Sequence, residues 1–338
     1  MLTPTVPGLG MGVPRRVIIG LTIVRQVIRA GGVLLVVSLL TFALCDAVPG
    51  DPLAEMRLNP QISSAALDTA RSKLRLDRPF VERYALWLRS VATGDLGFSA
   101  AYNTPVAPLI ARRVMNSLIL TGAALAATWL FAVPFGVWLA ARARRLDGRL
   151  MTAGVATLHA MPDLLIAAVL LQFAAASGVF PTGGLRSTGA NDMTVAAALA
   201  DRVRHLALPV LAIVLSAAPT IVRHVRAALI DVLGAPYLVA AAAKGVPYRR
   251  LLFRSALRAA ANPLIALFGL SVATLFSASL VVEVVMTWPG LGALLVEAVR
   301  SRDVHLVLAG VLCATSLQIL GTAFTEVALR LADPRIPV

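Results

Sequence analysis

Six apolar segments run along the chain, and the stretches between them hold most of its charged residues. The segments cover residues 29–48, 114–141, 150–176, 206–222, 259–282 and 304–328. Because the hydrocarbon core of a bilayer is about 30 Å thick, a helix needs about 20 apolar residues to cross it. The fourth segment is the shortest and contains Pro209 and Pro219, whereas the other five reach that length. The pattern predicts an all-α polytopic membrane protein with six transmembrane helices.

Composition supports this prediction, since 58% of the residues are hydrophobic and only 14% are charged. In a soluble protein a net charge of +14 and an isoelectric point near 11.3 would suggest nucleic-acid binding. Here the basic residues lie beside apolar spans, where they face anionic lipid headgroups. The sequence has neither zinc-finger spacing nor an RNA-binding aromatic motif. We therefore expect the lipid bilayer as a partner and no nucleic acid.

Basic residues are unevenly shared between the two sides that six spans create. With the amino terminus inside, seventeen lie in the cytoplasmic pieces, namely the amino-terminal segment, the loop after residue 141, the 223–258 insert and the tail. Only five lie in the two short outer loops: Arg186, Arg202, Arg204, Arg300 and Arg302. Cytoplasmic loops of membrane proteins carry an excess of lysine and arginine. The asymmetry predicts that both termini are cytoplasmic.

These spans divide the chain into a cytoplasmic segment 1–28, a first transmembrane helix 29–48, an extracytoplasmic loop 49–113, a core 114–329 and a cytoplasmic tail 330–338. In the loop, Pro49–Pro52 predicts a turn, residues 62–76 and 79–92 predict helices, and Gly94–Gly97 predicts a second turn. Tyr84 and Trp87 are good interfacial residues. We expect a small packed helical cap on the outer face, with a loosely held interfacial hairpin as the alternative.

The basic insert between the fourth and fifth spans contains a pattern typical of two short helices. Ala240 to Ala243 favour helix, and Pro236 suits a first helical position. Gly245 suits the left-handed residue that ends a helix, and Pro247 can open the next one. The sequence therefore predicts a helical elbow at about residues 235–257, which would form a docking surface on the membrane face.

Two other positions are candidates for a pathway or a gate. In the third span Pro162 removes a backbone hydrogen bond and bends the helix, and Asp163 is costly in lipid, so it faces a partner helix or an aqueous path. A structural kink with a locally satisfied carboxylate is the alternative. After Glu283, the run from Trp288 to Gly292 predicts a sharp turn at interface depth and then a short re-entrant helix. An ordinary interfacial turn is the alternative there.

The chain lacks the motifs of common catalytic sites. Neither of its lysines, Lys73 and Lys244, follows a glycine, so there is no Walker A sequence and any ATP would bind another subunit. Neither HExxH nor GxSxG occurs. Cys45 and Cys313 form no CxxC pair or Cys/His cluster, so we expect neither a metal site nor a structural disulfide. The protein is not expected to be an enzyme or to bind a cofactor.

In their order along the chain, several fragments resemble one family. They are Pro49–Pro52, Leu76–Pro79, Gly94–Gly97, Ala243–Gly245, Arg254–Arg258, Val282–Glu283, Trp288–Gly292 and Asp333–Arg335. The chain resembles the membrane subunits of binding-protein-dependent ABC importers, specifically the B-type permease of the oligopeptide, dipeptide and nickel group. The resemblance implies the type I importer permease fold and the inner (plasma) membrane of a bacterium.

In that family a Glu-Ala-Ala…Gly loop forms coupling helices that insert into the ATPase subunit. The glycine corresponds to Gly245 and the alanines to Ala240 and Ala241, but Val239 stands at the glutamate position. The departure puts any salt bridge from that acid in doubt. The elbow residues expected at the ATPase are Tyr237, Val239, Ala240, Ala241, Lys244, Gly245, Arg249 and Arg250. Arg250, Arg254 and Arg258 form one stripe, which meets either acids of the ATPase or lipid phosphates.

The resemblance also implies the partners. They are a second homologous permease, two ATP-binding subunits or one fused ATPase that hold ATP and Mg, and an extracytoplasmic substrate-binding protein. Short peptides are the expected cargo, and nickel or another small solute is the alternative. An ion-coupled secondary transporter using Asp163 or Glu283 is a rival, but it predicts internal repeats that the sequence does not show.

Overall fold

The computed structural model describes residues 15–187, except 48–77, together with residue 189 and residues 192–332. The predicted turn at Pro49–Pro52, the predicted helix 62–76 and the tail motif Asp333–Arg335 lie outside the described residues. The described elements are α1 (Arg15–Ala47), α4 (Phe80–Ala92), β1 (Phe98–Ser99), β2 (Thr104–Pro105), α5 (Val106–Ala141), α6 (Leu146–His159), α7 (Asp163–Ser177), α8 (Val195–Leu233), α9 (Pro236–Ala243), α10 (Tyr248–Arg250), a π-helix (Leu251–Ala256), α11 (Leu257–Ala259), α12 (Ala261–Val285), α13 (Leu291–Arg300) and α14 (Val304–Ala332).

Helices long and apolar enough to cross a membrane confirm the predicted fold class. Five helices meet this requirement singly, namely α1, α5, α8, α12 and α14, and the bent pair α6–α7 makes a sixth span if it is counted as one. Several helices extend well beyond the apolar runs and continue into the charged flanking residues. With 39 residues α8 is the longest, about 58 Å at 1.5 Å per residue. Four arginines expected in loops therefore lie on this helix: Arg202, Arg204, Arg223 and Arg226.

The third predicted span, 150–176, is not a single bent helix. It consists of α6 and α7, which meet at an angle of 96°. The break follows from Pro162, since the residue before a proline is pushed out of the helical region and proline itself suits a position just outside or at the start of a helix. Accordingly α6 ends at His159, and Pro162 precedes Asp163, the first residue of α7. The predicted bend at Pro162 is thus confirmed, and the structure shows it as a break between two helices.

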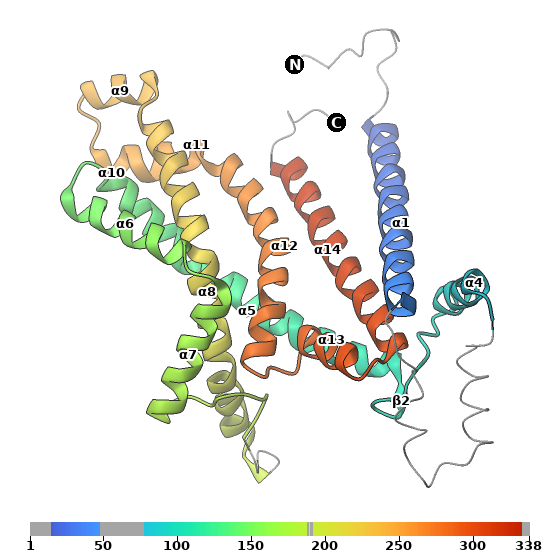
Figure 1. The fold of residues 1–338 in the computed structure, drawn as a ribbon. Helices are drawn as coiled ribbons and strands as arrows, with labels where there is room; N and C mark the ends of the chain where they lie inside the picture. The colour runs from blue at the N-terminus through green and yellow to red at the C-terminus, as the bar shows by residue number, and fades with distance from the viewer. Residues whose placement is uncertain (1–14, 48–77, 188, 190–191, 333–338) are drawn as a thin grey trace.

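The spans alternate in direction, and their ends gather in two sets (Figure 1). The start of α1 and the end of α14 lie at the same end of the molecule as α9 and α10. The α4 helix, the β-hairpin and α13 lie toward the opposite end. The predicted topology requires that both termini lie at the same end as the elbow. The assignment of that end to the cytoplasm stays a prediction.

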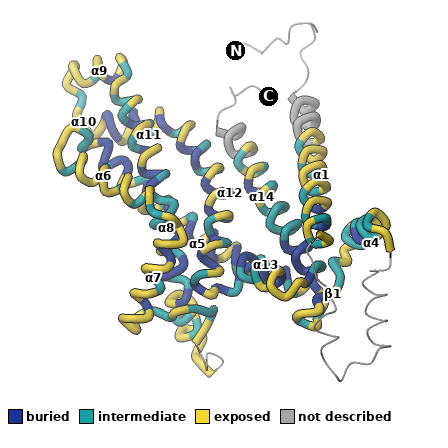
Figure 2. The backbone as a smooth tube through the Cα atoms, in the orientation of Figure 1, coloured by how far each residue is buried: buried dark blue, intermediate teal, exposed yellow. Residues whose placement is uncertain are grey.

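The core lies along α5, α8 and α12. Toward the elbow, Leu139, Val225 and Leu264 belong to one buried cluster, and toward the other end Leu120, Ile213 and Leu275 belong to a second. Gly136 allows α5 to approach α8 closely, because a Cβ there would lie 2.8 Å from the side chain of Val225. The exposed residues in Figure 2 lie mainly on the outward faces and on α9, as expected when lipid or another subunit covers the helices.

A compact cap follows the undescribed part of the long loop. The helix predicted over 79–92 is present as α4, and the structure adds a hairpin in which β1 pairs antiparallel with β2. Phe42 of α1 packs against the rings of Phe80 and Tyr84 at centroid distances of 5.4 and 5.5 Å. Trp87 is buried in the same cluster, so it is not an interfacial residue in this chain. These contacts support a packed cap, and its place on the outer face stays a prediction.

Candidate functional site

The helical elbow predicted at about residues 235–257 has the turn geometry that its sequence indicates. Pro236 occupies the first turn of α9, and the helix ends at Ala243. Gly245 has a φ of +83°. Its N–H donates to the Ala242 carbonyl at 2.9 Å, and the Val246 N–H donates to the Ala241 carbonyl at 3.2 Å. This pair of bonds is the Schellman motif, which needs a residue in the left-handed region and therefore favours glycine.

The second half of the elbow is not a simple helix. Pro247 precedes α10, which runs directly into the π-helix and then α11. Ala260 closes this run before α12 begins. π-Helical turns are rare and are found frequently at functional sites. The sequence analysis expected two short helices, so the π-helical register is a feature that it missed.

Buried side chains fix the elbow to the rest of the molecule. Leu238, Leu251 and Leu252 are 4–5% exposed and pack with Leu229 of α8 and Leu139 of α5. Ala256 and Ala260 are buried in the same cluster. The elbow is therefore continuous with the buried core that α5, α8 and α12 form.

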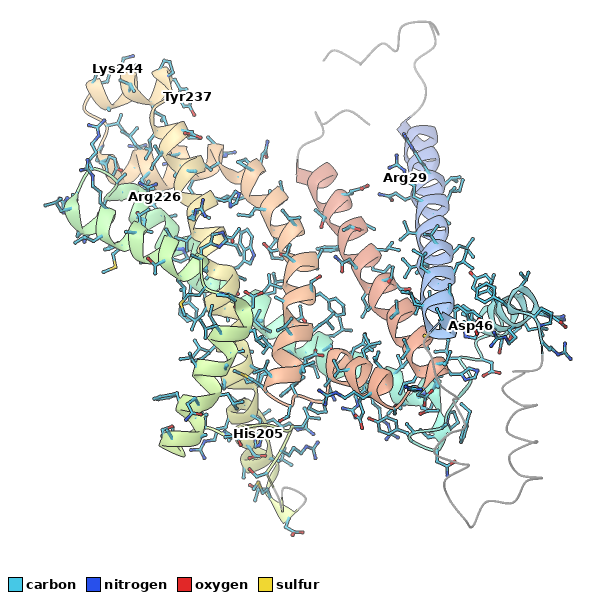
Figure 3. All side chains as sticks on the ribbon, viewed as in Figure 1. Arg29, Asp46, His205, Arg226, Tyr237 and Lys244 are labelled. Carbon is cyan, nitrogen blue, oxygen red and sulfur yellow. The ribbon has the colours of Figure 1, made fainter. Side chains whose placement is uncertain are left out.

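The outward surface of the elbow is apolar and basic. Tyr237 and Val239 are 59% and 55% exposed. Figure 3 shows Tyr237 and Lys244 at the tip of the molecule. Exposed large apolar side chains that belong to one patch are typical of protein contacts. The other residues on this surface are Ala240, Lys244, Gly245, Tyr248, Arg249, Arg250 and Phe253.

The structure distinguishes between the two alanines that the family motif indicates. Ala240 is exposed, whereas Ala241 is half-buried and packs on the core cluster that holds Leu238. Among the predicted docking residues, Ala241 therefore has the smallest free surface. Its carbonyl instead closes the Schellman turn.

The gate candidates in the broken span lie at its corner. Pro162 and Asp163 are both exposed, and Asp163 is the first residue of α7. A carboxylate in the first turn of a helix interacts favourably with the helix dipole, so its position has a local explanation. Pathway lining by Asp163 stays a prediction.

The gate candidates at the end of α12 are buried. Glu283 has no exposed surface, and its Oε2 accepts a hydrogen bond from the Gly292 N–H at 2.7 Å. Trp288 is 3% exposed, and its indole N–H donates to the Asn116 carbonyl at 3.2 Å. Trp288, expected in a turn at interface depth, thus packs in the protein core, and a gate role for it or Glu283 stays a prediction. The short helix expected after the turn is present as α13.

Two residues at this turn were missed by the sequence analysis. Asn116 donates through Nδ2 to the Pro289 carbonyl at 2.8 Å. Ser117 Oγ accepts the Leu291 N–H at 2.8 Å. The available signal was an Asn-Ser pair near the start of an otherwise apolar span, since polar side chains within spans usually bond to neighbouring helices.

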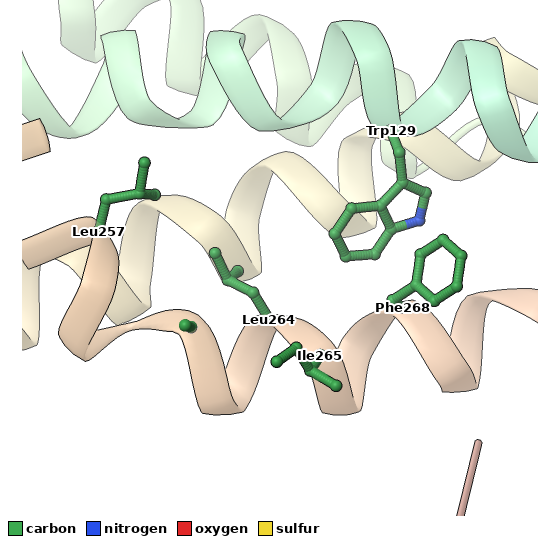
Figure 4. A pocket seen from close by; sticks show the side chains of 6 residues that line it. Trp129, Leu257, Leu264, Ile265 and Phe268 are labelled. Carbon is green, nitrogen blue, oxygen red and sulfur yellow. The ribbon is translucent and has the colours of Figure 1, made fainter. Parts of the chain in front are cut away.

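A shallow apolar pocket lies between α5 and α12 on the elbow side of the molecule (Figure 4). Trp129 and Phe268 form an edge-to-face pair in its wall, with their ring centroids 5.1 Å apart. Leu257, Ala261, Leu264 and Ile265 complete the lining. The lining carries almost no polar surface, and within the described part of the chain no three His, Cys, Asp or Glu residues lie together as metal ligands would.

Comparison with known proteins relates the whole chain to transport components. Residues 132–338 match the family model "Binding-protein-dependent transport system inner membrane component", and residues 21–126 match the model of the amino-terminal part of such membrane components. The elbow, the broken span and the Trp288 turn all fall within the first match. The two models leave only short stretches of the chain uncovered.

Individual relatives carry the same description. The chain is 32% identical over 318 residues to the oligopeptide transport system permease protein AppB of Bacillus subtilis, covering 93% of this chain and 98% of that protein. It is 31% identical to the glutathione transport system permease protein GsiC of Escherichia coli, over 93% and 98% of the two chains. It is 33% identical to the di/tripeptide transport system permease protein DppB of Pseudomonas aeruginosa, over 89% and 94%. Among solved structures, the MetNI methionine ABC transporter matches with a TM-score of 0.49 and 19% identity, over 65% of this chain and 96% of the matched chain.

Proposed function

The chain belongs to the family of inner-membrane components of binding-protein-dependent transport systems, and from this premise we propose that it is a permease subunit of an ATP-driven importer of short peptides. The observation that carries the proposal is the match over nearly the full length to permeases named for oligopeptides, di- and tripeptides and glutathione, which is itself a small peptide. The chain contributes no reaction chemistry, and partner subunits bind and hydrolyse ATP with Mg.

The elbow is the proposed site of coupling to the ATPase. Its exposed apolar and basic surface suits a groove lined by apolar and acidic side chains, and Leu238, Leu251 and Leu252 connect it rigidly to the core. A nucleotide shifts a conformational equilibrium only by binding its two states with different affinity. In this proposal the ATPase pair closes around ATP and moves the elbow, and the core helices then change the access of the pathway.

A second permease completes the pathway. Several large apolar residues on α5 and α7 are exposed in the isolated chain, among them Leu130, Phe131, Leu164 and Phe173. A related permease, identical or distinct, would cover part of these faces, and lipid would cover the rest. An extracytoplasmic binding protein delivers the cargo, so cargo selection is shared with a protein outside this chain.

Reconstitution tests the proposal. Vesicles would contain this chain, its partner permease, the ATPase subunits and the binding protein, with ATP on the ATPase side. We expect di- to pentapeptides to accumulate and to raise ATP hydrolysis, and a nickel chelate to do neither. Import of peptide by vesicles that contain this chain without any ATPase would refute the proposal.

A further inference from the structure

The α12 helix runs from the elbow toward the opposite end of the molecule without interruption. The elbow passes through Ala260 into α12, and the Leu264 N–H donates to the Ala260 carbonyl at 3.2 Å across this boundary. Pro263 lies in the first turn, where a proline is tolerated. With 25 residues, α12 is about 38 Å long. The α12 helix therefore links the elbow physically to the other end of the molecule, where Glu283 lies.

At that end Glu283 binds the first turn of α13. Its carboxylate accepts the N–H of Gly292, while Ser117 of α5 accepts the N–H of the preceding Leu291. The Glu283 carbonyl also accepts the Trp288 N–H at 2.9 Å. The first N–H groups of a helix have no partner within the helix, and anions stabilise that end. Glu283 and Ser117 thus supply what the start of α13 lacks.

Close packing leaves the first turn of α13 little freedom. A Cβ at Gly290 would overlap the Glu283 carboxylate, and a Cβ at Gly292 would lie 2.6 Å from the Leu280 carbonyl oxygen. Both glycines therefore let the backbone of α13 lie directly on α12. Glu283 Oε1 is buried and has no hydrogen-bond partner among the described residues. In so dry a place the hydrogen bond from the Gly292 N–H to Oε2 is stronger than it would be in water.

We propose that Glu283 is a positioning residue that couples α12 to α13, with Ser117 as its counterpart on α5. In this inference, which rests on the proposed function, motion of the elbow travels along α12 and moves α13 through the Glu283–Gly292 hydrogen bond. Glu283 acts neither on cargo nor on a driving ion. The α13 helix is consequently the moving part at the end of the molecule opposite the ATPase.

Four variants separate positioning from folding. Glu283→Ala removes the acceptor, whereas Glu283→Gln keeps an amide oxygen for the Gly292 N–H. Ser117→Ala removes the acceptor of the Leu291 N–H. Its matched control is Ser279→Ala, which replaces an equally buried serine whose hydroxyl donates to the Phe276 carbonyl of its own helix at 2.7 Å.

The first measurement is the amount of a tripeptide imported per ATP hydrolysed, in vesicles that contain the complete transporter. Loss of this buried hydrogen bond leaves the Gly292 N–H without its acceptor and should lower the ratio about tenfold in Glu283→Ala. Glu283→Gln should recover most of the loss, Ser117→Ala should fall in between, and Ser279→Ala should match the wild type. A fold defect would instead lower import and ATP hydrolysis together and leave their ratio unchanged.

The second measurement follows α13 itself. Spin labels at Val299 of α13 and Leu270 of α12 are placed in a variant that lacks Cys45 and Cys313, and both positions are about 60% exposed. Nucleotide trapping should shift this distance in the wild type, and in Glu283→Ala the distribution should be broad and insensitive to nucleotide. A wild-type import ratio in a Glu283→Ala transporter that also hydrolyses ATP at the wild-type rate, or equal ratios for the two serine variants, would overturn the inference. If Glu283→Ala does not assemble, the serine pair decides. Wild-type vesicles that show no ATP-driven import would contradict the proposed function instead.

Discussion

Replacement of Gly245 is the sharpest test of the elbow, because its effect acts through the backbone alone. No atom lies within 4 Å of a Cβ placed there, so Gly245→Ala creates no clash. The φ of +83° is nevertheless unfavourable for an L-residue, at a cost of about 1–2 kcal/mol. That energy changes the population of the elbow conformation by a factor of about 5–30. Gly245→Pro is more severe, because it sets φ near −65° and removes the N–H that donates to Ala242.

The assay compares the binding of the ATPase to the solubilised permease with peptide-stimulated ATP hydrolysis. We expect Gly245→Ala to weaken both measurably and Gly245→Pro to abolish stimulation while membrane insertion persists. The matched control is Gly154→Ala in α6, which also has nothing within 4 Å but lies in regular helix. There alanine is preferred over glycine by about 1 kcal/mol, so activity should be retained. Wild-type stimulation in Gly245→Pro would refute the reasoning.

Three further outcomes follow from the described contacts. Leu238→Ala should lower the free energy of unfolding by about 2–5 kcal/mol, and because Leu238 anchors α9, a melting curve should shift and ATPase binding should weaken. Burial and the neighbouring Glu297 raise the pKa of Tyr102 to about 12. A pH titration of phenolate absorbance should therefore show one component near that pH that is missing in Tyr102→Phe. The contribution of neutral Tyr102 to the free energy of unfolding should be lost between about pH 10 and pH 12. Hydrogen bonds from the Gly97 N–H and Ser90 lower the pKa of Asp95. The contribution of ionised Asp95 to the free energy of unfolding should therefore be present at neutral pH and lost on acidification below its ordinary pKa. In Asp95→Asn this part of the pH dependence of stability should be absent.

The sequence was sufficient where a single residue type carries the physical constraint. Hydropathy placed the spans, since lipid imposes both apolarity and length. Pro236 and Gly245 placed the start and the end of α9 because each has a restricted or permissive φ. The elbow could therefore be predicted to within a few residues before any contact was known.

Tertiary contacts were beyond the reach of these patterns. Trp288 reads as an interfacial residue until Asn116, 172 positions earlier in the chain, accepts its indole N–H. Glu283 reads as a costly intramembrane acid that marks a pathway, but its carboxylate meets a backbone N–H only because a turn brings α13 back onto α12. The proline likewise predicted a bend in the third span but not the 96° angle between α6 and α7. The environments of Trp288 and Glu283 depend on partners remote in sequence, and the break depends on a local angle that the sequence does not give.

The peripheral position of α1 gives the cap a mechanical role. Only 11% of its membrane-spanning window is buried, against 44% for α8 and α12, so lipid or another subunit must cover most of its surface. At the cap end, α1 is held by edge-to-face packing of Phe42 on the α4 rings and by an ion pair between Asp46 and Arg83. Toward the elbow end, Gln26 of α1 donates a hydrogen bond to Glu326 of α14. Aromatic packing and an ion pair therefore anchor the carboxyl-terminal end of α1 to the cap. The described part of the long loop therefore fixes one end of α1.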